Sequence, residues 1–241
     1  MDSIEDRLPV WRAELVRALP HDPLASTQGL VWHEGRLFES TGLIGASSLR
    51  EVELDSGTVL RRLDLPAEVY GEGLALIGDE IHVISWRNQT AFVFSRDGFD
   101  LLRTRTYEGE GWGLASDGQA LVMSNGSAEL VWRDAQDFVV RRRLAVHAAG
   151  VPLARLNALA WVKGELWANL LPSERIARLC PASGAVLGWI DASGLYAAHA
   201  QGVPAGPMNG IAYDAEGDRI FLTGKLWPWV FEVRLIKPSG A

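Results

Sequence analysis

The amino-acid sequence predicts an all-β protein with the fold of a five-bladed β-propeller. A four-residue motif, in which glutamine, glutamate, tryptophan or asparagine precedes a small and then an aliphatic residue, begins at Thr27, Gly71, Gly111, Leu156 and Met208. Its second positions lie 44, 40, 45 and 52 residues apart. Short apolar strands and polar turns follow each motif. Strand-containing repeats of about 40–50 residues are typical of propeller blades, which must stack around an axis to bury both faces of each sheet.

Each repeat contains a series of short strands joined by turns rich in glycine and aspartate, the pattern of an antiparallel meander. In the first repeat we expect strands over 28–33, 36–41, 48–54 and 58–65. In the second we expect 72–76, 80–86, 90–95 and 101–107. In the third we expect 112–115, 120–124, 129–133 and 138–146. In the fourth we expect 157–162, 165–169, 175–180 and 186–191.

The fifth repeat has only three strands before the chain ends, over 209–213, 219–223 and 229–235. We expect the alternating segment 13–18 to supply its fourth strand. An N-terminal strand in this place closes the last blade and covers an otherwise exposed sheet edge. Residues 1–241 are therefore predicted to form a single propeller domain. The insertion 194–207 is the one long loop, a length typical of functional or mobile loops.

The composition is that of a globular protein, with 48% hydrophobic and 22% charged residues. A net charge of −7 argues against a nucleic-acid partner, because phosphate binding requires a cationic surface. No apolar run is long enough to span a membrane. We expect the protein to be a monomer. The single cysteine, Cys180, excludes an internal disulfide. Since the acidic N-terminus does not resemble a signal peptide, we favour the cytoplasm over an exported form whose signal has been removed.

The second position of the motif is the first candidate for chemistry. In a propeller the first strand of each blade lines the central channel, so these positions form a ring: Gln28, Glu72, Trp112, Asn157 and Asn209. The alternative is that the amides hydrogen-bond the backbones of neighbouring blades. We favour a functional site, because Glu72 is the only acid in the ring. Among amides and indoles its pKa is expected to rise toward the range useful for proton transfer.

The ends of the second strands add further polar and aromatic residues to the same channel mouth: Ser40, Trp86, Asn125, Asn169 and Lys225. Lys225 has the charge to stabilise an oxyanion, or it pairs with Glu72. Trp86 and Trp112 either wall an apolar slot or pack between blades. The five histidines form no metal-binding pair such as H-E-x-x-H.

Several of these phrases, in order from about residue 21 to 235, resemble the glutaminyl cyclases of plants and bacteria. The phrases are His21-Asp22-Pro23, Thr27-Gln28-Gly29-Leu30, Glu39-Ser40-Thr41-Gly42-Leu43, Ser48-Leu49-Arg50, Gly71-Glu72-Gly73-Leu74, Tyr107 to Leu114, Trp167-Ala168-Asn169, Gly188-Trp189-Ile190-Asp191, Asn209 to Tyr213 and Thr223 to Pro228. The resemblance implies a five-bladed propeller that converts the N-terminal glutamine of a peptide to pyroglutamate and releases ammonia. It also implies that no transition metal or other cofactor is needed.

The resemblance also implies roles for individual residues. The family's catalytic glutamate falls on Glu72, which can take a proton from the attacking amine and return it to the leaving nitrogen. Its site lysine and amides fall on Lys225, Asn157 and Gln28, and its pocket aromatics on Trp86 and Trp112. We expect Lys225 and Asn157 to act with Glu72 in catalysis. The expected substrate contacts are Gln28, Trp86, Trp112, Tyr70, Asn209 and Asn169.

Three departures from the family pattern predict a wider or less aromatic pocket. Ser26 stands where the family usually has phenylalanine, and Asn157-Ala158-Leu159-Ala160 replaces Asn-Glu-Leu-Glu. Leu170 and Leu171 follow Asn169, where an aromatic residue is common.

Two other functions fit the repeat. A calcium-dependent propeller lactonase would use Glu72, Asn157 and Asn209 as oxygen ligands, although it would want a second acid as general base. A non-catalytic propeller would bind a protein partner through its loops. Chelator sensitivity separates the first alternative from a glutaminyl cyclase, and ammonia release separates the second.

Overall fold

The computed structural model describes residues 8–200 and 206–237. Within these ranges all regular secondary structure is β-strand, from β1 to β22, and no helix is present that could cross a membrane. The all-β class predicted from the sequence is confirmed.

Three antiparallel sheets contain four strands each, in the order of the sequence. The first contains β2 (Thr27–His33), β3 (Arg36–Thr41), β4 (Ser48–Glu53) and β5 (Val59–Asp64). The second contains β6 (Gly71–Ile77), β7 (Glu80–Ser85), β8 (Thr90–Ser95) and β9 (Leu101–Thr106). The third contains β10 (Leu114–Ser116), β11 (Ala120–Met123), β12 (Glu129–Asp134) and β13 (Val140–Ala145).

The remaining long strands form one eight-stranded sheet in two halves. One half contains β16 (Leu156–Val162), β17 (Glu165–Leu170), β18 (Arg175–Leu179) and β19 (Val186–Asp191). The other half contains β20 (Met208–Asp214), β21 (Arg219–Gly224), β22 (Trp229–Ile236) and β1 (Val10–Pro20). A short hairpin of β14 (His147–Ala148) and β15 (Val151–Pro152) precedes β16.

The N-terminal strand joins the two halves. β1 pairs antiparallel with β22, from Arg12 opposite Ile236 to Pro20 opposite Trp229, so the strand predicted over 13–18 covers the edge of the last repeat as expected. At its start, β1 also pairs parallel with β19, where Val10 lies opposite Trp189. The sequence did not predict this second pairing, because β1 extends three residues further toward the N-terminus than the alternating pattern.

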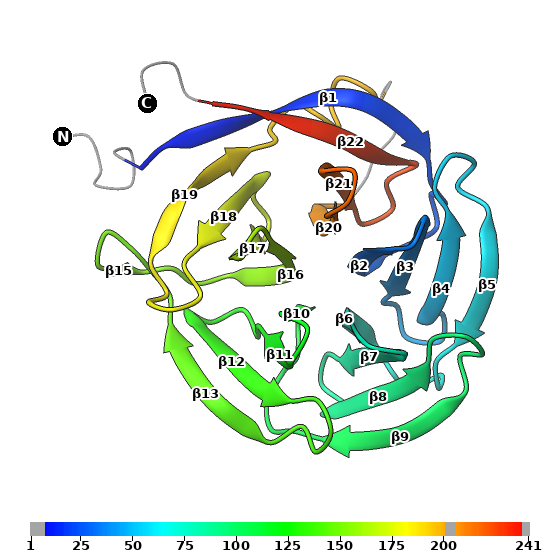
Figure 1. Ribbon diagram of the computed structural model, residues 1–241. Coiled ribbons are helices and arrows are strands. Elements are labelled where there is room, and N and C mark those ends of the chain that lie inside the picture. Colours follow the sequence, from blue (N-terminus) through cyan, green and yellow to red (C-terminus); the bar gives the residue numbers. More distant parts are fainter. Residues whose placement is uncertain (1–7, 201–205, 238–241) are drawn as a thin grey trace.

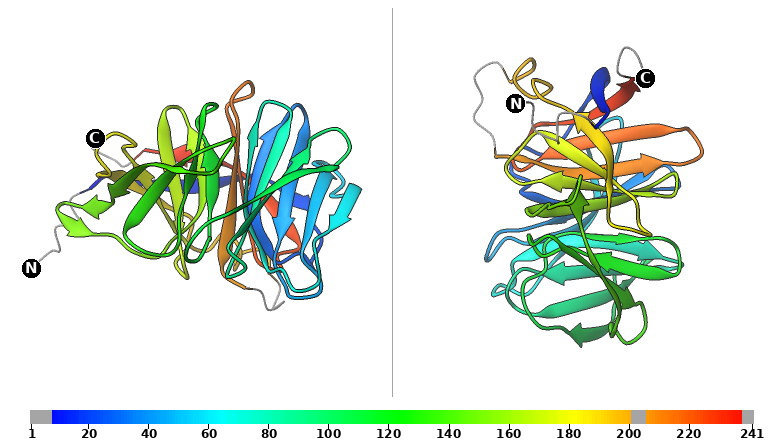
Figure 2. Two further views of the ribbon diagram at one scale, coloured as in Figure 1. Left: turned by 90° about the horizontal axis from the view of Figure 1, so that it is seen from below. Right: turned by 90° about the vertical axis from the view of Figure 1, so that its left-hand side faces the viewer.

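The sheets stand around a common axis in a propeller-like arrangement (Figure 1). The innermost strands β2, β6, β10, β16 and β20 contact one another in turn and form a closed ring. In the perpendicular views these strands run roughly along the axis (Figure 2).

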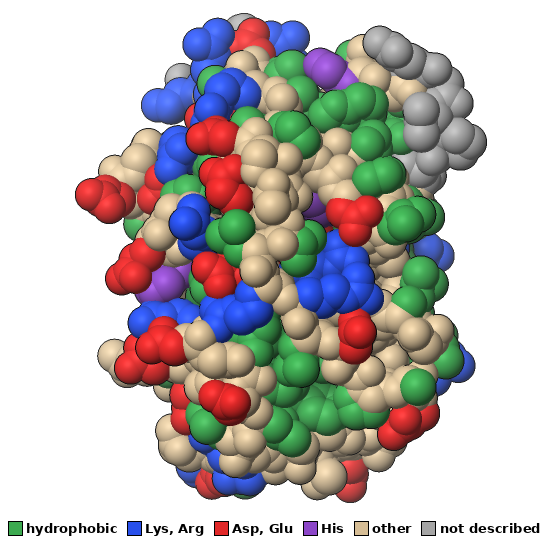
Figure 3. Space-filling view, turned by 90° about the vertical axis from the view of Figure 1, so that its right-hand side faces the viewer, with side chains coloured by type: hydrophobic (Ala, Val, Ile, Leu, Met, Phe, Trp, Pro, Cys, Tyr) green, Lys and Arg blue, Asp and Glu red, His purple; other side chains and the backbone are tan. Residues whose placement is uncertain are grey.

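Neighbouring sheets bury their apolar faces against each other. Phe38 and Leu49 of the first sheet, for example, share a cluster with Leu74, Ile81 and Val83 of the second. Strands at the periphery alternate between exposed and half-buried residues. On the side that they form, hydrophobic side chains lie between acidic and basic ones (Figure 3). The core therefore lies between the sheets, and no sheet is buried on its own.

The repeated motif marks an irregularity in the innermost strands. Pairing with the second strand shifts register at the motif in β2, β6, β16 and β20. In the third sheet the strand expected over 112–115 begins only at Leu114, because the Ser124 hydroxyl accepts the Gly113 N–H in place of a backbone carbonyl. Such bulges re-aim side chains, which explains why polar residues occupy these positions.

The motif glycine is required by close packing at the axis. A Cβ atom added to Gly29 would lie 2.5 Å from the backbone nitrogen of Leu74 in the neighbouring sheet. A Cβ atom on Gly73 would collide in the same way with the nitrogen of Leu114. Each glycine thus lets the next innermost strand approach.

Candidate active site

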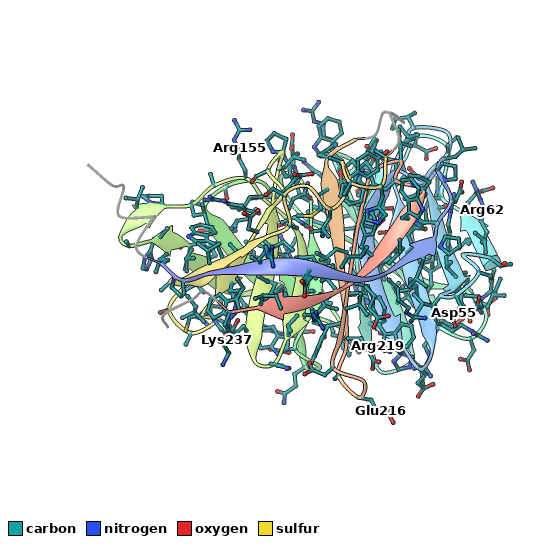
Figure 4. All side chains as sticks on the ribbon, turned by 90° about the horizontal axis from the view of Figure 1, so that it is seen from above. Asp55, Arg62, Arg155, Glu216, Arg219 and Lys237 are labelled. Atoms are coloured by element: carbon teal, nitrogen blue, oxygen red, sulfur yellow. The ribbon has the colours of Figure 1, made fainter. Side chains whose placement is uncertain are left out.

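The irregular ends of the innermost strands surround a cavity of about 170 Å³. Among the described residues its lining consists of Tyr70, Glu72, Trp86, Trp112, Asn157, Leu171 and Lys225. The cavity lies at the end of the ring where β6 and β16 begin. Arg155, directly before β16, projects from this end, whereas Glu216, after β20, projects from the opposite end (Figure 4). A second cavity, lined by residues such as Trp32, Trp161 and Tyr213 further along the innermost strands, has no carboxylate or lysine in its lining.

Glu72 is the acid of this cavity, and 6% of the residue is exposed. Burial raises its pKa well above the ordinary value of 4.5, because the carboxylate loses hydration. The positive charge of Lys225 lowers this pKa, and the negative charge of Glu110 raises it further. Glu72 therefore holds its proton more readily than an exposed glutamate, the direction expected from the sequence for this position.

Lys225 is the basic residue of the cavity, and its charge interacts with that of Glu72. Burial lowers the pKa of its ammonium group, and the nearby Glu72 carboxylate opposes this shift. The backbone of Lys225 is fixed on both sides, since its N–H donates to Pro207 O at 3.0 Å and its carbonyl accepts from Gly206 N at 2.9 Å. Burial therefore favours the neutral form of both groups, and their mutual attraction favours the charged forms. Such a balance suits a site that moves protons.

Asn157 contributes an amide whose oxygen has no partner among the described residues, although the residue is only 2% exposed. Its backbone carbonyl accepts a hydrogen bond of 2.8 Å from the Ser124 hydroxyl, which holds this part of β16 against the third sheet. A buried acceptor without a partner costs free energy, so a donor from a bound molecule is expected to occupy it.

Aromatic rings form the walls of the cavity. The Tyr70 and Trp86 rings meet edge to face, with centroids 5.6 Å apart. The indole N–H groups of Trp86 and Trp112 both donate to Oε2 of Glu110, at 2.8 and 3.0 Å. The indole donors are therefore occupied, and the walls offer mainly apolar surface.

Three of the predicted substrate contacts do not line the cavity. Gln28 lies behind Tyr70, to whose hydroxyl its Nε2 donates at 3.1 Å, and its oxygen accepts from Asn209 Nδ2 at 3.2 Å. Asn209 also accepts from Ala158 N at 3.3 Å, and Asn169 accepts from Gly210 N at 3.1 Å. Asn209 and Asn169 thus hydrogen-bond the backbones of neighbouring innermost strands, and for Asn209 this is the alternative stated for the ring positions.

Two further residues at the tips of the second strands also bond to the protein itself. Ser40 donates from its hydroxyl to the carbonyl of Glu72, which fixes the start of β6. Asn125 accepts from the backbone and hydroxyl of Ser127 within its own turn. The calcium ligand set considered for a lactonase is not assembled either, because the Asn209 oxygen bonds Ala158 N and the residue does not line the cavity beside Glu72 and Asn157.

Glu110 was not predicted to accept hydrogen bonds from the two indoles. It was visible two residues before Trp112, but its contact with Trp86 depends on the packing of the second sheet against the third. Leu171, which stands near the place of a family aromatic, lines the cavity as an aliphatic side chain. Over residues 8–200 and 206–237 there is no cluster of three or more His, Cys, Asp or Glu side chains able to hold a metal ion.

Comparison with known proteins points to one family. Residues 2–235 match the profile of a family described as "Glutamine cyclotransferase". The chain is 38% identical over 233 residues to a glutaminyl-peptide cyclotransferase of Arabidopsis thaliana, and the match covers 94% of this chain and 72% of the plant protein.

Two solved structures place the fold. A glutaminyl cyclase of Myxococcus xanthus superposes with a TM-score of 0.91 at 36% identity, covering 97% of this chain and 100% of the bacterial one. The WD40 β-propeller domain of Doa1 superposes with a TM-score of 0.52 at 9% identity, over 85% of this chain and 62% of that chain, a likeness of fold alone. On the profile match and the identity to the plant protein, the chain belongs to the glutamine cyclotransferase family.

Proposed function

We propose that the protein is a glutaminyl-peptide cyclotransferase, which converts the N-terminal glutamine of a peptide to pyroglutamate with release of ammonia. The observation that carries the mechanism is the buried Glu72 carboxyl group, whose pKa is raised, in one cavity with Lys225 and Asn157. The name of the plant relative and the solved bacterial structure support the same reaction.

We further propose that the fold is a five-bladed β-propeller formed by a single domain. The closed ring of innermost strands supports this count, because each half of the eight-stranded sheet supplies one of them and then corresponds to one blade. The similarity of fold to a WD40 propeller supports the architecture.

The reaction joins the α-amino nitrogen of glutamine to its own side-chain carbonyl carbon and breaks the bond from that carbon to the amide nitrogen. The attacking amine must be neutral, and with a pKa of about 7.7–8 a useful fraction of it is neutral at physiological pH. The amine loses a proton as the new bond forms, and the leaving nitrogen gains one and departs as ammonia. One proton moves across the site and no external reactant is consumed.

Glu72 is the group placed to move this proton. As a carboxylate it accepts the proton from the attacking nitrogen, and as the acid it donates the proton to the leaving nitrogen. General acid–base groups work best when their pKa lies near the working pH, and burial moves the pKa of Glu72 in that direction.

The tetrahedral intermediate carries an oxyanion, which the ammonium group of Lys225 and the amide N–H of Asn157 stabilise. The unpartnered oxygen of Asn157 accepts from the substrate amine or amide. The indole N–H groups take no part, since Glu110 holds both of them. Lys225 and Asn157 therefore remain as the oxyanion donors.

Tyr70, Trp86 and Trp112 enclose the methylene groups of the substrate and fold its side chain back toward its own amine. This is a proximity effect, so the shape of the slot contributes alongside the proton transfer. Gln28 then acts indirectly, through its hydrogen bond to the Tyr70 hydroxyl. Asn209 and Asn169 hold Gln28 and the strand backbones in place.

The test is ammonia release from a dipeptide that begins with glutamine, together with detection of the cyclised product by mass spectrometry. The assay is repeated with EDTA and with the Glu72→Gln variant. We expect turnover that EDTA leaves unchanged and that the variant loses. Turnover abolished by EDTA would support a metal-dependent enzyme, and the absence of any turnover would support a binding protein.

A further inference from the structure

Glu110 connects the two tryptophan walls of the cavity without lining it. One carboxylate oxygen, Oε2, accepts from Trp86 Nε1 at 2.8 Å and from Trp112 Nε1 at 3.0 Å. Trp86 follows β7 of the second sheet, and Trp112 precedes β10 of the third sheet. A single atom therefore links side chains that come from two different sheets.

The other oxygen of Glu110 is bonded as well. Oε1 accepts from Arg87 Nε at 3.0 Å, and the Arg87 guanidinium stacks over the Trp86 ring at 3.8 Å from the ring centroid. Trp86 is thus held at its N–H by Glu110, on its ring face by Arg87 and by the edge contact with Tyr70.

Trp112 is held at its two ends. Glu110 binds its N–H, and the six-membered ring lies over Gly126, where an added Cβ atom would be 2.7 Å from the ring carbon Cη2. Both tryptophans are only partly buried, so close packing alone does not fix their rotamers. Hydrogen bonds to a charged acceptor are stronger than neutral ones and define a direction.

We propose that Glu110 is a positioning residue, whose carboxylate sets the separation of the Trp86 and Trp112 rings and thereby the width of the slot for the glutamine side chain. This inference rests on the cyclotransferase function proposed above. Glu110 is not itself a catalytic residue, because both of its oxygens are bonded to the side chains around it and it does not line the cavity.

The charge of Glu110 has a second effect on the site. Four charged or titratable groups act on Glu72 or are affected by it: Lys225, Glu110, Tyr70 and Tyr107. Lys225 lowers the pKa of Glu72 and Glu110 raises it, whereas Tyr70 and Tyr107 stay neutral because burial raises the pKa of each. Removing the charge of Glu110 therefore lowers the pKa of Glu72.

These two effects are separable by two substitutions. Glu110→Gln removes the charge and keeps the length of the side chain. Glu110→Asp keeps the charge and draws it back from the indoles by one methylene. The matched control is Glu108→Gln, at an exposed glutamate two residues away.

We expect both Glu110 variants to raise KM by about tenfold, with a smaller change in kcat, since the slot widens. In Glu110→Gln the acidic limb of the kcat/KM profile moves to lower pH, and in Glu110→Asp it stays in place. Tryptophan emission of the free protein shifts to longer wavelength, and acrylamide quenches it more strongly, in both variants. Glu108→Gln changes none of these quantities.

The fluorescence measurement needs no substrate, so it tests Glu110 even if the wild-type protein releases no ammonia and the proposed function fails. If both Glu110 variants showed the same KM and the same tryptophan emission as Glu108→Gln, this result would overturn the inference. Loss of the folded state in both Glu110 variants, measured by circular dichroism, would overturn it too. The Glu110 side chain is 36% exposed, and a positioning role does not require it for folding.

Discussion

Replacing Glu72 by glutamine is the most informative single change, because it alters one proton-carrying group and almost no volume. Positioned acid–base groups contribute about 10²–10⁴ in rate, which corresponds to about 3–5 kcal/mol of transition-state stabilisation. Glu72 is expected to serve both proton transfers, so kcat should fall by at least about a hundredfold. KM should change little, because the walls formed by Tyr70, Trp86 and Trp112 remain.

The same substitution that lowers activity is expected to stabilise the folded protein at alkaline pH. The pKa of Glu72 is raised in the folded state, so its favourable contribution is fully present below its ordinary pKa of 4.5 and is lost as the pH rises through the folded value. Glutamine has no proton to lose. The variant should therefore melt at a higher temperature than the wild type at alkaline pH, and the difference should vanish below pH 4.5.

The assay is initial-rate ammonia release, with thermal melts recorded across the same pH range. Glu68→Gln, at an exposed glutamate four residues earlier, is the control and should match the wild type in both measurements. A Glu72→Gln enzyme that keeps its turnover would refute the proton-transfer role. If the Glu72→Gln variant melted at a lower temperature than the wild type at alkaline pH, this would refute the argument that burial disfavours the carboxylate.

Three further changes test other parts of the structure. Lys225→Met removes an oxyanion donor and should lower kcat by about a hundredfold. It also raises the pKa of Glu72, so the acidic limb of the kcat/KM profile should move to higher pH. A limb that does not move would contradict the interaction between Lys225 and Glu72. Gly126→Ala places a methyl group 2.7 Å from the Trp112 ring, at a residue with φ of +80°. KM should rise by about tenfold, and the free energy of unfolding should fall by about 1–3 kcal/mol. Unchanged kinetics would show that the Trp112 ring does not pack over Gly126. Burial lowers the pKa of His82 from 6.5 to about 4, so the folded state loses stability as the pH falls through this window. Denaturant titrations at pH 4 and pH 7 measure this loss in the wild type and in His82→Leu, where it should be smaller by up to about 3 kcal/mol. An equal loss of unfolding free energy in the two proteins would contradict the role given to His82.

The strand order was predictable because apolar alternation and turn residues are local signals. The pattern failed at Trp112, where hydroxyl and backbone bonds of Ser124 replace the regular ladder. It also missed the first residues of β1, whose pairing with β19 depends on a contact between the two halves of the eight-stranded sheet.

The candidate site was predictable only in part. Equivalent positions in the repeat led to Glu72, Trp112 and Asn157, which do line the cavity. Gln28 and Asn209 occupy the same repeat position but point into hydrogen bonds with each other and with neighbouring strands. Periodicity places a residue on a strand, whereas a bulge decides the direction of its side chain.

The pairing of β1 with β19 and β22 also bears on how the chain is made. β1 leaves the ribosome before the other described strands, whereas its partner strands β19 and β22 belong to the last two repeats. Until they are synthesised, β1 has no neighbouring strand in the sheet, and Lys225 is added to the chain only after β19. Contacts of such long sequence separation form late, so the nascent protein acquires its cavity only after Lys225 and β22 have been synthesised.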